Sequence, residues 1–135
     1  RVLKGAYEGS LPKFIEAMAA GRAPTIYGDG TQTRDFCFVD DVARALRLGV
    51  DAADAPGRVV NIGAGRETSL LDLVAALNGA LGAAIEPRFE APRSGDIHRS
   101  CADVARARSV LGFTAAVGLD EGLGRALAQW TGDAP

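Results

Sequence analysis

The chain has 135 residues, a length suited to one domain, and its hydrophobic share of 47% is enough to build an ordinary globular core. Its formal net charge is −2 and its basic residues are scattered, which excludes the basic patch that a nucleic-acid-binding protein needs. The most apolar stretch, residues 70–85, is too short for a bilayer and contains Asp72 and Asn78, so we expect no membrane segment.

The first half of the chain predicts two helices and two strands after an irregular lead-in over residues 1–10. A first helix is expected from Pro12 to Ala20, where Gly21 ends it. A short strand follows over residues 25–27, and the Asp29-Gly30 pair indicates a turn. A second strand, opened by Arg34, is expected over residues 35–39. Asp40 or Asp41 should then cap a helix whose apolar side chains are Val42, Ala45, Leu46 and Val50.

The second half predicts two more strands and three helices. The β-branched run at residues 58–62 reads as a buried strand, and residues 85–89 as another. Ser69 and Asp72 approximate a capping box that opens a helix with an apolar stripe to Leu81. Asp103 should cap a helix that Gly112 stops, and the last helix is expected over residues 119–130. Helices alternate with short strands, so the predicted fold class is α/β, with one domain over residues 11–135.

Several apparent motifs do not fit a catalytic or cofactor site. Gly63-Ala64-Gly65 resembles a dinucleotide fingerprint, but Thr68 stands where the third glycine should be, so a glycine turn is the better interpretation. His98 is the single histidine, which argues against triads and multi-histidine metal sites. Cys37 and Cys101 lack the spacing of zinc or redox motifs, and we read them as reduced thiols in a cytoplasmic protein. The sequence thus predicts no catalytic, cofactor-binding or metal-ligating residue.

Five segments, in this order, carry a family resemblance: Tyr27-Gly28-Asp29-Gly30, Thr33-Arg34-Asp35-Phe36, Val39-Asp40-Asp41-Val42, Asn61-Ile62-Gly63-Ala64-Gly65 and Arg93-Ser94-Gly95-Asp96. The chain resembles the C-terminal, substrate-binding half of the NAD-dependent epimerase/dehydratase family, the extended short-chain dehydrogenases, and most of all the UDP-glucose 4-epimerases. The family's glycine-rich cofactor motif and its Tyr-x-x-x-Lys pair are not present. Together with the start at Arg1, this leads us to expect a fragment without the N-terminal Rossmann half.

The resemblance implies a nucleotide-sugar site made of Tyr27, Arg34, Arg93, Asp96 and Ser100. It places the aromatic ring near the base, both arginines on the diphosphate, the aspartate on the ribose, and the serine in the sugar pocket, where it would leave room for an N-acetyl group. Guanidinium groups suit phosphate oxygens because they donate in a fork.

Each of these residues also has a purely structural interpretation. Tyr27 could be a core aromatic side chain, and Arg34 a surface arginine paired with Asp29 or Asp35. Arg93 and Asp96 could pair within their own turn, and Ser100 could be a surface serine. Asp40 and Asp41 look like an acid/base pair, but capping and packing explain them better.

The resemblance therefore implies part of an NAD-dependent nucleotide-sugar epimerase that binds the UDP part of its substrate. A dehydratase or reductase of the same family, or a non-catalytic nucleotide-sugar binding module, remain alternatives. NAD would belong to the complete enzyme, and this chain alone should be inactive. The expected partners are a UDP-sugar, the N-terminal half and a second copy of the chain, because the helix at residues 40–50 and the strand at 58–63 should expose apolar surface when that half is absent.

Overall fold

A computed structural model describes residues 9–132 of the chain, so all of the predicted lead-in except Gly9 and Ser10 lies outside the described residues. Five helices and four short strands make up the described part, which confirms the α/β class. In chain order they are α1 (Ser10–Ala19), β1 (Thr25–Tyr27), β2 (Thr33–Arg34), α2 (Val39–Asp51), β3 (Thr68–Ser69), α3 (Leu70–Leu81), β4 (Arg88–Glu90), α4 (Ala105–Leu111) and α5 (Leu119–Thr131).

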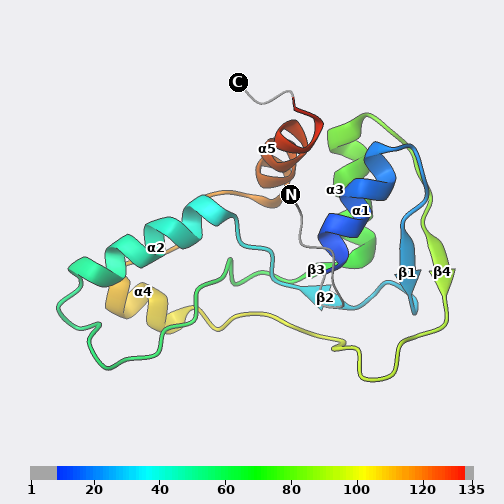
Figure 1. Cartoon of the computed structure of the whole chain (residues 1–135). Helices are drawn as coiled ribbons and strands as arrows, with labels where there is room; N and C mark the ends of the chain where they lie inside the picture. Colours follow the sequence, from blue (N-terminus) through cyan, green and yellow to red (C-terminus); the bar gives the residue numbers. More distant parts are fainter. Residues whose placement is uncertain (1–8, 133–135) are drawn as a thin grey trace.

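The strands form two small pairs (Figure 1). β1 and β4 run parallel, with Thr25 opposite Arg88 and Tyr27 opposite Glu90. β2 and β3 run antiparallel, and Thr33 also bridges to Arg99 on the loop after β4. This bridge brings the loop over residues 91–100 beside β2, although more than sixty residues separate them in the sequence.

The main core lies between α1, α3 and α5, with Ile26 of β1 packed against them. Phe14, Ile15 and Met18 of α1 are buried at the spacing that the sequence predicts for one helix face. The capping box is present, because the Ser69 hydroxyl accepts from the N–H of Asp72 and the Asp72 carboxylate accepts from the N–H of Ser69. This local pattern fixes where α3 begins.

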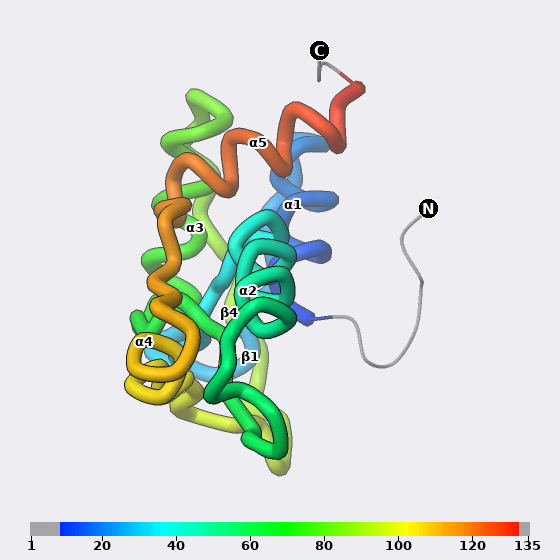
Figure 2. Tube along the Cα trace, turned by 90° about the vertical axis from the view of Figure 1, so that its left-hand side faces the viewer, coloured from blue at the N-terminus to red at the C-terminus, as the bar shows by residue number. Residues whose placement is uncertain are grey.

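A second, smaller core joins α2 and α4, which lie side by side in both views (Figures 1 and 2) and apart from α1 and α3 in Figure 1. Its buried members are Ala45, Ala107 and Phe113. Gly112 has a φ of 62° and ends α4, as the sequence predicts. The packing of Phe113, which follows α4, in this core brings that segment close to α2.

The two predicted strands at residues 35–39 and 58–62 are wrong. Beyond Arg34 the ladder stops because the strands are antiparallel and β3 begins at Thr68, opposite Arg34, so residue 35 has no strand residue to pair with. Residues 58–62 keep an alternating pattern, with Val60 and Ile62 packed on the smaller core and Val59 78% exposed. No strand in the described part of the chain lies alongside them, and an extended segment without a hydrogen-bonded neighbour is not a strand.

The predicted face of α2 is also partly wrong. Phe38 occupies the N-cap position, and both aspartates lie inside the first helical turn. Ala45 is buried, but Leu46 is 68% and Val50 is 85% exposed. The helix instead turns Asp41 towards the protein interior, where the side chain is almost inaccessible. Within residues 9–132, no helix has both the length and the apolar character needed to cross a membrane.

Candidate functional site

Tyr27 ends β1 immediately before a glycine-rich turn. Gly28 and Gly30 have φ values of 89° and 82°, a conformation that side chains other than glycine rarely adopt. At Gly30 a Cβ atom would also lie 2.8 Å from Leu71 Cγ, so the turn is packed closely on α3. The turn therefore has a fixed shape, and it sends the chain from β1 directly into β2.

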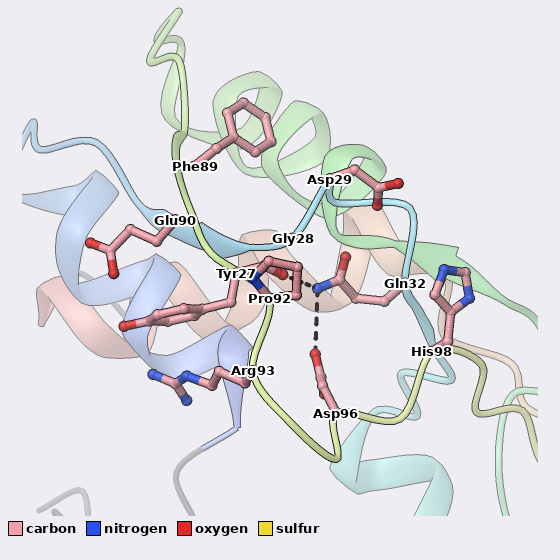
Figure 3. Close-up of a pocket in the computed structure, with 10 residues that line it drawn as sticks. All are labelled: Tyr27, Gly28, Asp29, Gln32, Phe89, Glu90, Pro92, Arg93, Asp96 and His98. Carbon is pink, nitrogen blue, oxygen red and sulfur yellow. Dashed lines mark hydrogen bonds between the residues drawn. The ribbon is translucent and has the colours of Figure 1, made fainter.

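Gln32 ties this turn to the loop after β4. The side chain is 5% exposed, and its amide donates to the carbonyl oxygen of Tyr27 at 2.6 Å and to Asp96 Oδ2 at 3.5 Å (Figure 3). The sequence analysis missed this residue, because a single glutamine in a turn has no distinguishing pattern. Its contacts position two of the predicted site residues relative to each other.

Arg34 contacts the same loop through both terminal nitrogens of its guanidinium. Nη2 lies 2.8 Å from Asp96 Oδ1, while Nη1 donates to the carbonyl oxygens of Ile97 at 2.5 Å and Thr33 at 2.8 Å. The alternative pairings with Asp29 or Asp35 are therefore not the ones observed. Side-chain exposures of 28% for Arg34 and 37% for Asp96 leave both groups within reach of a ligand.

Arg93 lies over the ring of Tyr27, with the guanidinium carbon 3.6 Å from the ring centroid. Figure 3 shows the guanidinium alongside the ring, on the side away from Phe89. Gly95 has a φ of 80°, and the N–H of Asp96 donates to the carbonyl oxygen of Arg93 at 3.3 Å, so these residues form a turn. Asp96 pairs with Arg34 rather than with Arg93, and the two side chains of the turn take different partners.

These side chains line a cavity of about 480 Å³, here called the basic cavity. Its lining has five cationic side chains against the single carboxylate of Asp96. The cations are Lys13, Arg22, Arg34, Arg88 and Arg93. Because Asp96 is already paired with Arg34, the basic cavity carries a clear excess of positive charge and suits an anion.

A second cavity of about 670 Å³, here called the outer cavity, adjoins it and shares Tyr27, Gln32, Arg93 and Asp96. Its remaining charged lining is acidic, from Asp29 and Glu90, with His98 beside them. Hydrogen bonds from the Thr31 hydroxyl and N–H hold the pKa of Asp29 below its usual range, so its carboxylate stays charged. Phosphate is therefore expected in the basic cavity rather than in the outer one.

The structure thus brings four of the five predicted residues together, namely Tyr27, Arg34, Arg93 and Asp96. Ser100 is exposed and lines neither cavity. Its N–H donates to the carbonyl oxygen of Thr33 at 3.2 Å, a contact that attaches the loop to β2. Its predicted place in a sugar pocket stays a prediction.

The glycine pair at Gly63 and Gly65 is organised by the protein's own carboxylate. Asp35 accepts from the N–H groups of Ala64 and Gly65, each at 3.0 Å, and from that of Ala102 at 3.1 Å. A Cβ atom at Gly63 would lie 2.6 Å from Asp35 Oδ2. Backbone donors that a dinucleotide phosphate would need at this turn are therefore occupied, in agreement with a structural turn.

Asp41 has a structural role rather than a catalytic one. Its carboxylate accepts from the N–H groups of Ala116 and Val117 at 2.9–3.0 Å and from Arg44 at 2.6 Å. Burial alone would raise the pKa of Asp41, but the bonds from Val117, Arg44 and Ala116 outweigh it and lower the pKa. Asp40, its neighbour, is exposed and pairs with Arg125. Among the described residues no group of three or more ligand side chains is placed to hold a metal ion.

Comparison with known proteins finds similarity to nucleotide-sugar epimerases. Residues 3–63 match the model of the NAD dependent epimerase/dehydratase family. The chain is 48% identical over 118 residues to a UDP-glucose 4-epimerase of Mycolicibacterium smegmatis. In three dimensions it resembles the UDP-glucose 4-epimerase of Thermotoga maritima solved with UDP-glucose, with a TM-score of 0.85 and 36% identity. It also resembles the UDP-glucuronic acid 4-epimerase of Bacillus cereus solved with UDP-glucuronic acid and NAD, with a TM-score of 0.86 and 28% identity.

These matches include most of this chain but a minor part of each relative. The aligned region is 87% of this chain and 37% of the Mycolicibacterium protein. For the two structures the shares are 94% of this chain and 41% of the other. The sequence motifs predicted a resemblance to one portion of such enzymes, and the partial coverage of each relative confirms it.

Proposed function

We propose, from the confirmed resemblance to the NAD-dependent epimerase/dehydratase family, that this chain is the nucleotide-binding part of a nucleotide-sugar 4-epimerase. Its substrate would be a UDP-sugar, as in the relatives named above. Residues 11–135 would act as the substrate-binding domain. The observation that carries the proposal is the convergence of Tyr27, Arg34, Arg93 and Asp96 on one cavity with an excess of cations.

Each side chain has a chemical role that its position supports. Arg34 and Arg93 present guanidinium donors to the diphosphate, which they can bind through paired hydrogen bonds. Asp96 accepts from ribose hydroxyls, and its pairing with Arg34 fixes the orientation of its carboxylate. Tyr27 offers an aromatic face to the base. In this arrangement the protein binds the base, the ribose and the diphosphate of the substrate and leaves the sugar free to react elsewhere in the enzyme.

NAD would supply the redox chemistry of the complete enzyme, by accepting hydride from the sugar and returning it to the other face. The Gly63–Gly65 turn would not hold the phosphates of NAD, because the N–H groups of Ala64 and Gly65 already donate to Asp35. The contribution of this chain would be to bind and orient the substrate, and positioning alone can lower a reaction barrier substantially. The proposed partners are therefore a cofactor-binding half and the nucleotide sugar.

Calorimetric titration of the chain with UDP, UDP-N-acetylglucosamine and GDP tests the proposal. We expect saturable binding that favours the uridine nucleotides. Arg34→Ala should weaken UDP binding by roughly tenfold to a hundredfold, the usual effect of losing a charge-assisted hydrogen bond.

Arg99→Ala is the matched control. Arg99 lies on the same loop and pairs with Glu67, but it lines neither cavity and its side chain is 78% exposed. This variant should bind UDP within about twofold of the wild type, in line with the small effect of exposed ion pairs. No binding by the folded wild type, or equal losses in the two variants, would contradict the proposed site.

A further inference from the structure

The basic cavity has three cations that the diphosphate does not require, and one of them has a distinct position. Arg88 lies at the start of β4, directly opposite Thr25 of β1 in the parallel register. Its Nη2 lies 3.1 Å from the Thr25 hydroxyl oxygen, to which it donates, so the guanidinium of this exposed residue is held beside β1. Lys13 and Arg22, the other two, line the same cavity from α1 and from the turn that follows it.

Three pairs of side chains therefore succeed one another along the basic cavity. Arg34 with Asp96 marks one end, and Arg93 over Tyr27 follows. Thr25 with Arg88 lies two residues further back along β1, which corresponds to about 6.6 Å. Alternate residues of a strand face the same side, so Thr25 and Tyr27 share a face of β1, while Ile26 between them is fully buried.

The successive parts of a nucleotide, from its phosphates and ribose to its base, could bind at these three pairs in the same order. With the ribose at Asp96, the phosphates at Arg34 and Arg93, and the base taking the place of the Arg93 guanidinium on the Tyr27 ring, the far edge of the base points towards Thr25 and Arg88. This placement rests on the proposed function. We propose that Arg88, positioned by Thr25, reads the edge of the nucleotide base and selects bases that carry a carbonyl oxygen there.

The selectivity follows from the donors of a guanidinium. Arginine has N–H donors and no acceptor. Uracil and guanine present a carbonyl oxygen at the edge opposite the sugar, whereas cytosine and adenine present an amino group in the same place. Arg88 can donate to the first kind and meets another donor in the second. A site built for one hydrogen-bonding pattern rejects the opposite pattern more strongly than a pocket that reads shape alone.

UDP and CDP are the probes for this proposal, because they share the ribose and the diphosphate and differ at that edge. Calorimetric titration of the wild-type chain should show a preference for UDP of roughly tenfold or more. Arg88→Met keeps the length and the apolar stem but removes every donor and the charge. It should abolish the preference for UDP, because UDP loses both the hydrogen bond to its base and the charge, whereas CDP loses the charge alone.

Arg22→Met is the matched control, since it removes a cation from the same cavity at a position to which no base contact is assigned. It should weaken UDP and CDP by the same factor, as a general loss of positive charge would. Thr25→Val, which removes the hydroxyl that holds Arg88 but keeps the shape of the side chain, should reduce the UDP preference partly. Far-UV circular dichroism would verify that each variant is folded.

The outcomes separate the two proposals. Equal weakening of UDP and CDP in Arg88→Met would make Arg88 one more general cation and overturn the inference, as would a wild type that binds both nucleotides equally well. In either case the proposed nucleotide site would still stand. A folded wild type that binds neither nucleotide would overturn the proposed function and this inference with it.

Discussion

Replacing Asp41 tests the structural interpretation of the aspartate pair at the start of α2. Asp41 is 2% exposed, and its two carboxylate oxygens accept from two backbone N–H groups and from Arg44. These bonds attach the first turn of α2 to the segment after α4. Asp41→Asn keeps the size of the side chain and one acceptor oxygen, but it places an amino group where the second oxygen accepts from the N–H of Val117.

The expected loss follows from these contacts. An unpartnered buried donor costs about 1–3 kcal/mol of the free energy of unfolding, and the weakened bond to Arg44 adds to it. Asp40→Asn is the control, because Asp40 is the adjacent residue and its side chain is 59% exposed in its pair with Arg125. An exposed pair contributes about 0–1 kcal/mol, so the two variants should differ clearly.

Urea unfolding at neutral pH, followed by far-UV circular dichroism, measures both variants. Asp41→Asn should lower the urea midpoint markedly at an unchanged m-value, while Asp40→Asn should leave it nearly unchanged. Equal midpoints for the two variants would refute the reasoning, since they would mean that the buried bonds of Asp41 contribute no more than a surface pair.

The pH dependence supplies a second readout of the same residue. The folded state lowers the pKa of Asp41 from its ordinary value of 3.8, so the unfolded chain binds the proton more readily. The stabilisation from Asp41 is thus complete above that value and is lost as the pH falls through the lower pKa of the folded state. Asp41→Asn should lose less stability than the wild type across this acidic range.

Two further predictions concern association and activity. Leu46 and Val50 form an exposed apolar stripe with Val39 on α2, so the chain should self-associate, and Leu46→Glu should shift it towards monomer in sedimentation velocity experiments. A wild type that stays monomeric at high concentration would contradict this. The chain supplied with NAD should not convert UDP-glucose to UDP-galactose, because its sequence has no Tyr-x-x-x-Lys pair, and measurable turnover in a coupled assay would argue against that.

The elements that the sequence predicted well are those whose signals are local. Ser69 and Asp72 fix the start of α3 by bonds within one helical turn, and Gly112 ends α4 through its own backbone conformation. The predicted strands at residues 35–39 and 58–62 failed because a strand depends on a partner elsewhere in the chain, which a local pattern cannot supply. Only the short stretches that found a neighbour became β1 to β4.

The site shows the same division. Motif context pointed to Tyr27, Arg34, Arg93 and Asp96, and the structure brings all four to one cavity. Their pairing was not predictable, because Arg34 and Asp96 lie 62 residues apart and each had closer candidates in the sequence. Gln32 was missed for a related reason: its importance lies in joining two separate segments, and nothing in the residues around it indicates that.

The contacts of Arg34 explain how one side chain can hold the loop and still bind phosphate. A guanidinium has five N–H donors, and three bonds, to Thr33, Ile97 and Asp96, are made within the protein. Two donors therefore remain for a ligand when each of these bonds takes a separate hydrogen. A lysine at this position would have three donors in all and would have to give up a loop contact for each phosphate contact. The arginine fork thus allows the loop that carries Asp96 to be in place before the nucleotide arrives, which lowers the ordering cost of binding.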